Sequence, residues 1–232
     1  MLNSDKKDKQ VKVSVLMAVF NTDFSYTKRA IDSVLNQDFQ DFELIIIDDG
    51  STENDRDSLT AYVERHEDKI VYIRHANQGQ AASINRGVLN STGEFITIID
   101  SDDEYKPSHL NACLREIKQF DLMCSTSETI VDSIEDYYVP DKNDLEKNIH
   151  LDDVILFGTL FGSRKVFLTI PFQGGFAADS AFYEKASAQF QVKKANLRTY
   201  IYYRNNANSI CSILKKQKTL ANGVHDFSYS CK

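Results

Sequence analysis

The stretch "FITIIDSDDEY", from Phe95 to Tyr105, sets an apolar segment directly against a group of acids. Its first five residues are mostly apolar and β-prone, which predicts a buried strand. That strand ends on Asp100, Asp102 and Asp103, three carboxylates within four positions, where like charges repel. Uncharged turn residues would end a buried strand without this repulsion, so the acids point to a role beyond the turn.

The segments upstream of this stretch alternate between strand and helix patterns. Short apolar runs predict strands at 13–19, 42–48 and 70–74, and amphipathic patterns predict helices near 26–37, 57–66 and 79–90. Strands that are apolar on both faces are typical of a parallel sheet covered by helices on both sides, with right-handed crossovers. We therefore expect a single α/β domain with a doubly wound, mostly parallel, Rossmann-like sheet.

Polar clusters follow three of these strands. "FNTD" follows the first strand, "DDGST" the second, and "DSDDE" the strand at Phe95. The carboxyl ends of parallel strands meet at one edge of a doubly wound sheet, and ligands bind in the crevice outside that edge. We expect the three clusters to converge there.

The second half of the chain is less regular. We expect a helix from Pro107 to Phe120, a strand near 121–125, a helix at 179–190 and a strand at 197–204. Residues 126–150 are acidic and weakly patterned, which predicts a loop or excursion.

Composition excludes several classes of protein. With 232 residues, a net charge of −7 and a pI near 5.3, the chain does not resemble a nucleic-acid-binding domain. Its four cysteines form no CxxC pair, which argues against a zinc site and a disulfide framework and favours reduced cytosolic thiols. It has no G-x-G-x-x-G or P-loop motif, so nicotinamide dehydrogenases and P-loop NTPases lose support, and it has no G-x-S-x-G motif.

The termini and apolar runs bear on localisation. No signal-peptide core stands at the N-terminus, and the longest apolar run is too short to span a bilayer, so we expect a cytoplasmic protein. Basic residues at 6–12 and 215–218 could touch an anionic membrane surface, which would place the protein at the inner face of the membrane. Solvated terminal segments are the more ordinary interpretation.

Asp100 and Asp102 are candidate metal ligands. Alternate residues of an extended segment face the same way, so both carboxylates can enter one site, while Asp103 braces the turn. Mg²⁺ or Mn²⁺ takes one or two carboxylates and shares its remaining positions with water and substrate phosphates. The alternative is an acidic turn that caps the next helix.

Other polar positions each carry two interpretations. An acid of "DDGST", Asp48 or Asp49, could bind a nucleoside, or the segment could be a plain turn. Phe20 could stack on a nucleobase or lie in the core. Arg86 could pair with a phosphate or be a surface residue of its helix.

The order of these motifs resembles that of family 2 glycosyltransferases of the GT-A fold. The resemblance rests on "VSVLMAVFN", "SVLNQ", "FELIIIDDGST", the helix containing Asn85, "GEFI" and "DSDD", and covers about residues 11–107. The second half is similar more loosely, through "FAAD" before a helix and "YYRNNANSICS" after it.

The resemblance implies transfer of a sugar, with inversion, from a nucleotide-diphosphate donor to a hydroxyl acceptor. It implies Mn²⁺ or Mg²⁺ as cofactor, a UDP-sugar as the expected donor, and a carbohydrate or lipid-linked acceptor, as in cell-surface polysaccharide or glycoconjugate synthesis. It divides the chain into a basic tail (1–10), a nucleotide-sugar-binding half (11–106), an acceptor-binding half (107–212) and a C-terminal tail (213–232).

The resemblance also assigns roles to individual residues. Phe20 and Asp49 would contact the nucleobase with Asp48 beside them, Asn85 would belong to the donor site, Asp100 and Asp102 would hold ribose, metal and diphosphate, and Asp179 would be the general base.

The chain departs from the family pattern at three positions. Ala18 replaces a usual Pro, Ile84 a frequent Arg, and Ala178 a frequent Glu before the base. Two other functions stay open at this point: a nucleotidyltransferase, and a non-catalytic nucleotide-binding module on the same fold. For Asp179, the alternative to a base is a helix N-cap.

Overall fold

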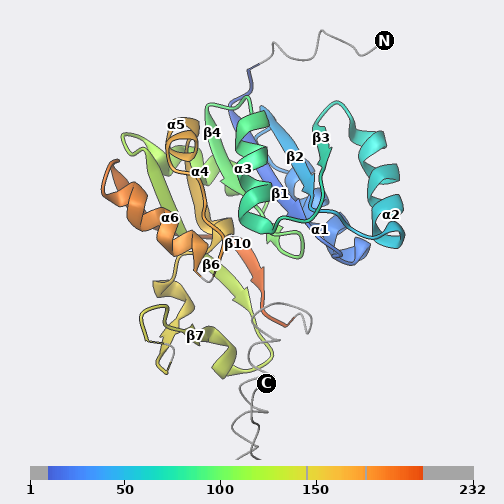
Figure 1. Cartoon of the computed structure of the whole chain (residues 1–232). Coiled ribbons are helices and arrows are strands. Elements are labelled where there is room, and N and C mark those ends of the chain that lie inside the picture. The colour runs from blue at the N-terminus through green and yellow to red at the C-terminus, as the bar shows by residue number, and fades with distance from the viewer. Residues whose placement is uncertain (1–9, 145, 176, 206–232) are drawn as a thin grey trace, which may run out of the picture.

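The computed structural model describes residues 10–144, 146–175 and 177–205 and is built on one eight-stranded sheet (Figure 1). The strand order is β3-β2-β1-β4-β9-β6-β10-β5. The strands are β1 (Val13–Val19), β2 (Phe42–Asp48), β3 (Ile70–Arg74), β4 (Phe95–Ile98), β5 (Glu104–Tyr105), β6 (Leu122–Ile130), β9 (Leu160–Ser163) and β10 (Val192–Tyr203).

The parallel part of this sheet confirms the prediction for the first half. Strand β1 lies between β2 and β4, pairs with both in parallel, and β3 extends the sheet beyond β2. Leu16 of β1 pairs with Ile45 of β2 and Ile98 of β4, and all three side chains are buried. Continuous apolar strands form here because helices cover both faces.

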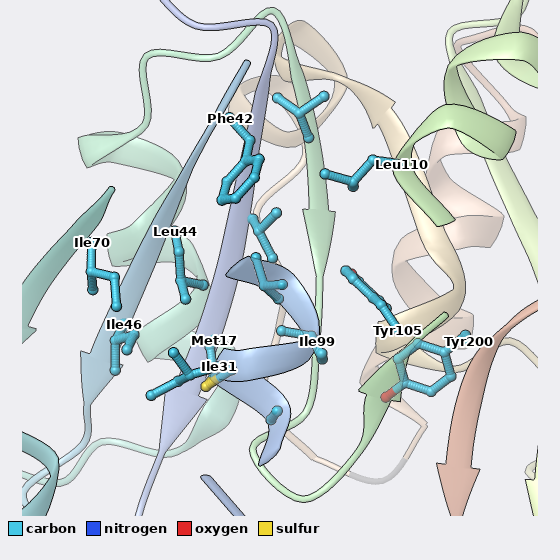
Figure 2. Packing of buried hydrophobic residues seen from close by; sticks show 14 of the residues in the cluster. Met17, Ile31, Phe42, Leu44, Ile46, Ile70, Ile99, Tyr105, Leu110 and Tyr200 are labelled. Carbon is cyan, nitrogen blue, oxygen red and sulfur yellow. The ribbon is translucent and has the colours of Figure 1, made fainter. Parts of the chain in front are cut away.

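Two buried clusters, one on each face, make up the core. On one face, strand residues pack against α1 (Phe24–Leu35), α2 (Glu53–Val63) and α4 (His109–Ile117); Figure 2 shows part of this cluster. On the other face they pack against α3 (Gln80–Asn90), α5 (Arg164–Thr169) and α6 (Ala178–Ser187), with α3 crossing the near side in Figure 1. None of the helices in the described ranges is long and apolar enough to cross a membrane.

Several predictions for the second half need correction. Strand β6 continues to Ile130, so the loop predicted from residue 126 begins five residues later. Helix α4 begins at His109 rather than Pro107, after the N-cap Ser108. Strand β9 pairs antiparallel with both β4 and β6, and β5 is antiparallel to β10, so the sheet is mixed beyond β4.

Residues 131–150 form an excursion that extends away from the main sheet, at the lower end of Figure 1. It contains a 3₁₀ turn (Ile134–Tyr137) and a two-stranded hairpin of β7 (Tyr138–Pro140) and β8 (Asn148–His150). The ring of His150 stacks on Tyr137 with centroids 5.8 Å apart. Short 3₁₀ turns at Glu64–His66, Leu151–Asp153 and Phe157–Thr159 complete the elements. The predicted C-terminal tail, Cys211 and Cys231 lie outside the described residues.

Helix α1 fixes the segment that follows the acidic loop. Arg29 and Ser33 lie one turn apart on the helix, and Gln37 follows directly after its C-cap Asn36. Arg29 donates to the carbonyl of Asp102, and the Ser33 hydroxyl accepts from the amide of Tyr105 at 3.1 Å. Gln37 is buried; it donates to the carbonyl of Lys106 at 2.8 Å and accepts from the amide of Leu110 at 3.0 Å. The Gln of "SVLNQ" therefore fixes the backbone beyond the acids.

We predict that Gln37→Ala lowers the free energy of unfolding by about 2–3 kcal/mol, because it leaves the buried N–H of Leu110 without its partner and removes one of the two donors to the Lys106 carbonyl, the other being the His109 N–H. Gln40→Ala is the matched control, since Gln40 is exposed and its side chain donates to the carbonyls of Leu35 and Gln37. Denaturant unfolding measures both. Equal losses in the two variants would show that Gln37 is not the anchor described here.

Candidate functional site

Three loops meet at the carboxyl edge of the parallel strands, as the sequence predicts. Asn21, after β1, donates its backbone N–H to the Ser51 hydroxyl at 3.1 Å, and its side-chain oxygen accepts from the amide of Thr52 at 2.8 Å. The hydroxyls of Thr22 and Ser101 are 2.7 Å apart and join the first loop to the acidic loop. Hydrogen bonds therefore join the three loops at this edge, and we call the joined loops the platform.

Asp48, the last residue of β2, is fully buried beneath this platform. Its carboxylate accepts from the Tyr72 hydroxyl at 2.5 Å and the Ser51 amide at 2.7 Å, and Arg74 lies 3.3 Å away. Burial opposes ionisation, but these bonds and the Arg74 charge outweigh it and lower the pKa of Asp48. Asp48 therefore stays charged and holds the second loop to β3.

Asp49 joins the second loop to the start of α3. Its two carboxylate oxygens accept the backbone N–H groups of Gln78 and Gly79, each at 2.8 Å. Gly79 has φ of +89°, a conformation that favours glycine, and it is the N-cap of α3. Asp49 thus shapes the turn that brings α3 to the edge. Its contact with a nucleobase stays a prediction.

The acidic loop contains the strongest electrostatic conflict in the site. Asp100 accepts from Gln80 Nε2 at 2.7 Å through one oxygen, and its other oxygen is 3.3 Å from the Tyr200 hydroxyl. Burial and the charges of Asp102 and Asp179 raise the pKa of the Asp100 carboxyl to about 7. These acids therefore lie close enough together for each to oppose the ionisation of Asp100.

Asp103 turns inward, away from this group. It is buried, and accepts from the Tyr200 hydroxyl and, at 2.8 Å, from the backbone N–H of Tyr203. Burial and the charges of Asp100 and Asp102 raise its pKa well above the usual range. The prediction that Asp103 braces the turn is confirmed.

Asp179 reaches the site from the second half of the chain. It lies in the first turn of α6, whose N-cap is Ala177 in a left-handed conformation (φ 55°), so the N-cap interpretation of Asp179 is wrong. Burial raises the pKa of Asp179 to about 6, against hydrogen bonds from backbone N–H groups including that of Ser180 at 2.7 Å. A carboxylate that titrates near neutral pH is suited to accepting a proton.

The remaining predicted residues lie around this edge. Phe20 is 49% exposed directly after β1, so the interpretation as a core residue is wrong and its ring is open to stacking. Asn85 bonds both backbone groups of Phe172, at 2.8 and 2.9 Å, and fastens the segment before α6. Ile84, which replaces a family Arg, is fully buried in the core, and Arg86 is exposed on α3.

The acidic loop suits a divalent cation that shares its ligands with a substrate. Among the residues described here, no three His, Cys, Asp or Glu side chains are gathered as a complete metal site. Asp100 and Asp102 nevertheless provide hard oxygen ligands whose mutual repulsion a cation would relieve. The donor set therefore fits Mg²⁺ or Mn²⁺ with the remaining positions filled by diphosphate and water.

Sequence reasoning missed Gln80 and Tyr200 as neighbours of Asp100. Both belong to segments that the sequence places correctly, a helix start and a strand, but neither residue type stands out there. No local signal identifies them, because their contacts with Asp100 span 20 and 100 positions.

A protein-family model described as "Glycosyl transferase family 2" matches residues 14–178, most of the chain. The chain belongs to this family. Among curated relatives, an uncharacterised glycosyltransferase of Nostoc is 41% identical over 113 residues, covering 49% of this chain and 35% of that protein. The putative glycosyltransferase EpsH of Bacillus subtilis is 37% identical over 103 residues, covering 44% of this chain and 29% of EpsH. The matches thus span about a third of these relatives.

Solved structures share the fold at low sequence identity. The mannosyltransferase PcManGT of Pyrobaculum calidifontis, in complex with GDP-Man and Mn²⁺, has a TM-score of 0.68 at 13% identity and covers 96% of this chain and 67% of its own. TarS of S. aureus with UDP-GlcNAc has a TM-score of 0.64 at 18% identity, covering 85% and 62%. The fold is therefore the GT-A fold of glycosyltransferases.

We predict that Asp100→Asn stabilises the ligand-free protein increasingly as pH rises. The folded-state pKa of Asp100, about 7, exceeds the unfolded value of about 3.9, so wild type loses stability as pH rises through that window. Asn cannot ionise, so the gain in free energy of unfolding should be small at pH 4 and largest above pH 7. Denaturant unfolding from pH 4 to 8 measures it.

Asp68→Asn, in the exposed turn before β3, is the control for this series and should follow the wild-type curve. Parallel curves for Asp100→Asn and wild type would contradict the proposed conflict among the acids.

Proposed function

We propose that this protein transfers a sugar from a nucleotide-diphosphate donor to a hydroxyl acceptor, with inversion at the anomeric carbon. The observation that carries the proposal is the meeting of Asp100, Asp102 and Asp179, from two halves of the chain, at the edge where the sheet's ligands bind. Family membership and the nucleotide-sugar complexes of the two structural neighbours support it.

On the donor side, the platform provides an exposed ring, two acids that hold its loops, and two further acids that would bind a cation. Phe20 offers a face on which a nucleobase can stack, and Asp49 and Asp48 hold the loops beside it. Asp100 and Asp102 would hold Mn²⁺ or Mg²⁺ and, through it, the diphosphate. The cation supplies charge that stabilises the departing diphosphate. UDP is the first nucleotide to test, and GDP the second.

On the acceptor side, Asp179 would take the proton of the attacking hydroxyl. Its carboxylate lies close enough to Asp100 to influence that residue's pKa, so a sugar held at Asp100 would be within reach of an acceptor at Asp179. The first turn of α6 stabilises the ionised form through the helix dipole, while burial keeps the group basic enough to act. We propose a carbohydrate or lipid-linked acceptor, reached at the inner face of a membrane.

We predict that Asp102→Asn keeps the fold and weakens the Mn²⁺-dependent part of UDP binding by about tenfold or more. Loss of an outer-shell partner alone costs 10- to 100-fold in metal affinity, and a direct ligand should cost at least as much. Calorimetric titration of UDP with and without Mn²⁺ measures it. Asp38→Asn, an exposed acid at the opposite end of α1, is the control. Full metal dependence in Asp102→Asn would show that the ligand assignment is wrong.

We predict that Asp179→Asn slows sugar transfer by about 10²- to 10⁴-fold while leaving the donor affinity unchanged, because the amide cannot accept the acceptor's proton. In wild type, kcat/KM should rise with pH through about 6, where Asp179 loses its proton, and this rise should vanish in the variant. Transfer rates from pH 5 to 8, beside donor Kd values, provide the measurement.

Glu184→Gln, on the same helix but exposed and paired with Lys142, is the control for the base. Loss of transfer in Glu184→Gln with normal transfer in Asp179→Asn would move the base to Glu184. Release of a free nucleoside diphosphate by wild type separates sugar transfer from nucleotidyl transfer, which releases pyrophosphate. Donor binding without any release would favour the binding module.

A further inference from the structure

Tyr200 lies directly beneath the acidic loop and is fully buried. Its hydroxyl donates to one oxygen of Asp103 and is 3.3 Å from an oxygen of Asp100. A phenol carries one proton, which goes to Asp103 in the shorter of these contacts. One neutral side chain therefore meets two of the three acids.

Strand β10 is irregular just before Tyr200. The register between β10 and β6 shifts between Ala195 and Tyr200, and Arg198 in this segment has a left-handed φ of 51°. The Arg198 guanidinium is tied to the carbonyl of Ser127 at 2.8 Å and to Asp152 at 2.5 Å. Such irregularities redirect the side chains that follow them. Here the redirected strand brings both the Tyr200 hydroxyl and the Tyr203 amide to Asp103.

The ring of Tyr200 occupies a fitted socket. A Cβ at Gly158 would lie 2.0 Å from the ring, so only glycine leaves room for it there. Tyr105 packs edge-on with centroids 5.8 Å apart, as Figure 2 shows for the two labelled rings, and its own hydroxyl donates to the carbonyl of Ile98 at 2.7 Å. The socket fixes where the Tyr200 hydroxyl points.

We propose that Tyr200 is a positioning residue for the candidate cation site: by binding Asp103 from below, it leaves Asp100 and Asp102 directed at the open edge. This inference rests on the proposed function, because it concerns the same carboxylates. Without the phenol, Asp103 keeps one backbone donor at Tyr203 and its second oxygen is unpartnered beside Asp100. A movement of the loop that relieves this acid would move Asp100 with it.

A purely structural role for Tyr200 makes a different prediction. Loss of the hydroxyl would then lower the free energy of unfolding but leave the effect of Mn²⁺ on nucleotide affinity unchanged. The ratio of UDP affinity with Mn²⁺ to that without it therefore distinguishes the two roles.

The test compares Tyr200→Phe with Tyr203→Phe. Tyr203 is on the same strand, and its hydroxyl donates to Glu104 at 2.5 Å. Tyr203→Phe therefore removes a hydrogen bond to a nearby acid but leaves the bond from the Tyr200 hydroxyl to Asp103 intact. We expect Tyr200→Phe to lower the Mn²⁺-dependent gain in UDP affinity by 10- to 100-fold, with metal-free UDP affinity unchanged, and Tyr203→Phe to keep the full gain. Calorimetry with UDP and GDP, and Mn²⁺ binding followed by electron paramagnetic resonance, provide the readouts.

A double-mutant cycle with Asp103→Asn checks the route of the effect. If Tyr200 acts through Asp103, Tyr200→Phe should have no further effect on the Mn²⁺-dependent gain when residue 103 is Asn. The double variant also removes the buried charge, so it should fold even if Tyr200→Phe alone does not. Equal losses from Tyr200→Phe in both backgrounds would overturn the proposed route.

The outcomes separate this inference from the proposed function. A Mn²⁺-dependent gain in wild type that survives in Tyr200→Phe overturns the role of Tyr200 and leaves the donor site standing. No Mn²⁺-dependent gain in wild type, with either UDP or GDP, overturns both. A gain lost in Tyr200→Phe and kept in Tyr203→Phe supports both.

Discussion

Repulsion among carboxylates at the end of β4 is the constraint on which the site depends. Asp100, Asp102 and Asp103 lie within four residues, and Asp179 adds a fourth negative group from another segment. Burial, together with the charges of the neighbouring acids, opposes ionisation in this cluster and raises the pKa values of Asp100 and Asp103. This arrangement costs stability in the ligand-free protein, and the proposed cation and diphosphate would offset that cost because the cation's charge opposes the repulsion.

Much of the surrounding structure limits the movement that this repulsion would cause. Helix α1 and the residue after its C-cap hold the backbone at and beyond the acids, through Arg29, Ser33 and Gln37. Thr22 holds Ser101 from the first loop, and β10 binds Asp103 from below. These contacts come from three different parts of the chain. Together they keep the acids clustered against the mutual repulsion that would move them apart.

The sequence predicts the parallel half of the fold well because its information is local. The sheet is specified by continuous apolar strands and by helix periodicity. The edge where its loops meet is specified by "DDGST" and "DSDD", which stand at strand ends. The second half was predicted less well. Strand β9 enters antiparallel between β4 and β6, and the sequence predicts a loop for residues 127–130 although they pair with β10. Strand order depends on long-range pairing, which no local pattern reports.

The same distinction applies to the site. Asp100 and Asp102 could be found from the sequence because an acid at a strand end is unusual, whereas Tyr200 looks like any β-prone aromatic residue. The role of Tyr200 can be seen only in the fold, where its hydroxyl contacts both Asp100 and Asp103. The need for glycine at residue 158 can likewise be seen only once the Tyr200 ring is placed against it. The family match ends at Ala178, before both Asp179 and Tyr200. The acids of the candidate site therefore depend on residues beyond the matched region, and a fragment cut at that boundary would lose β10, the strand that binds Asp103.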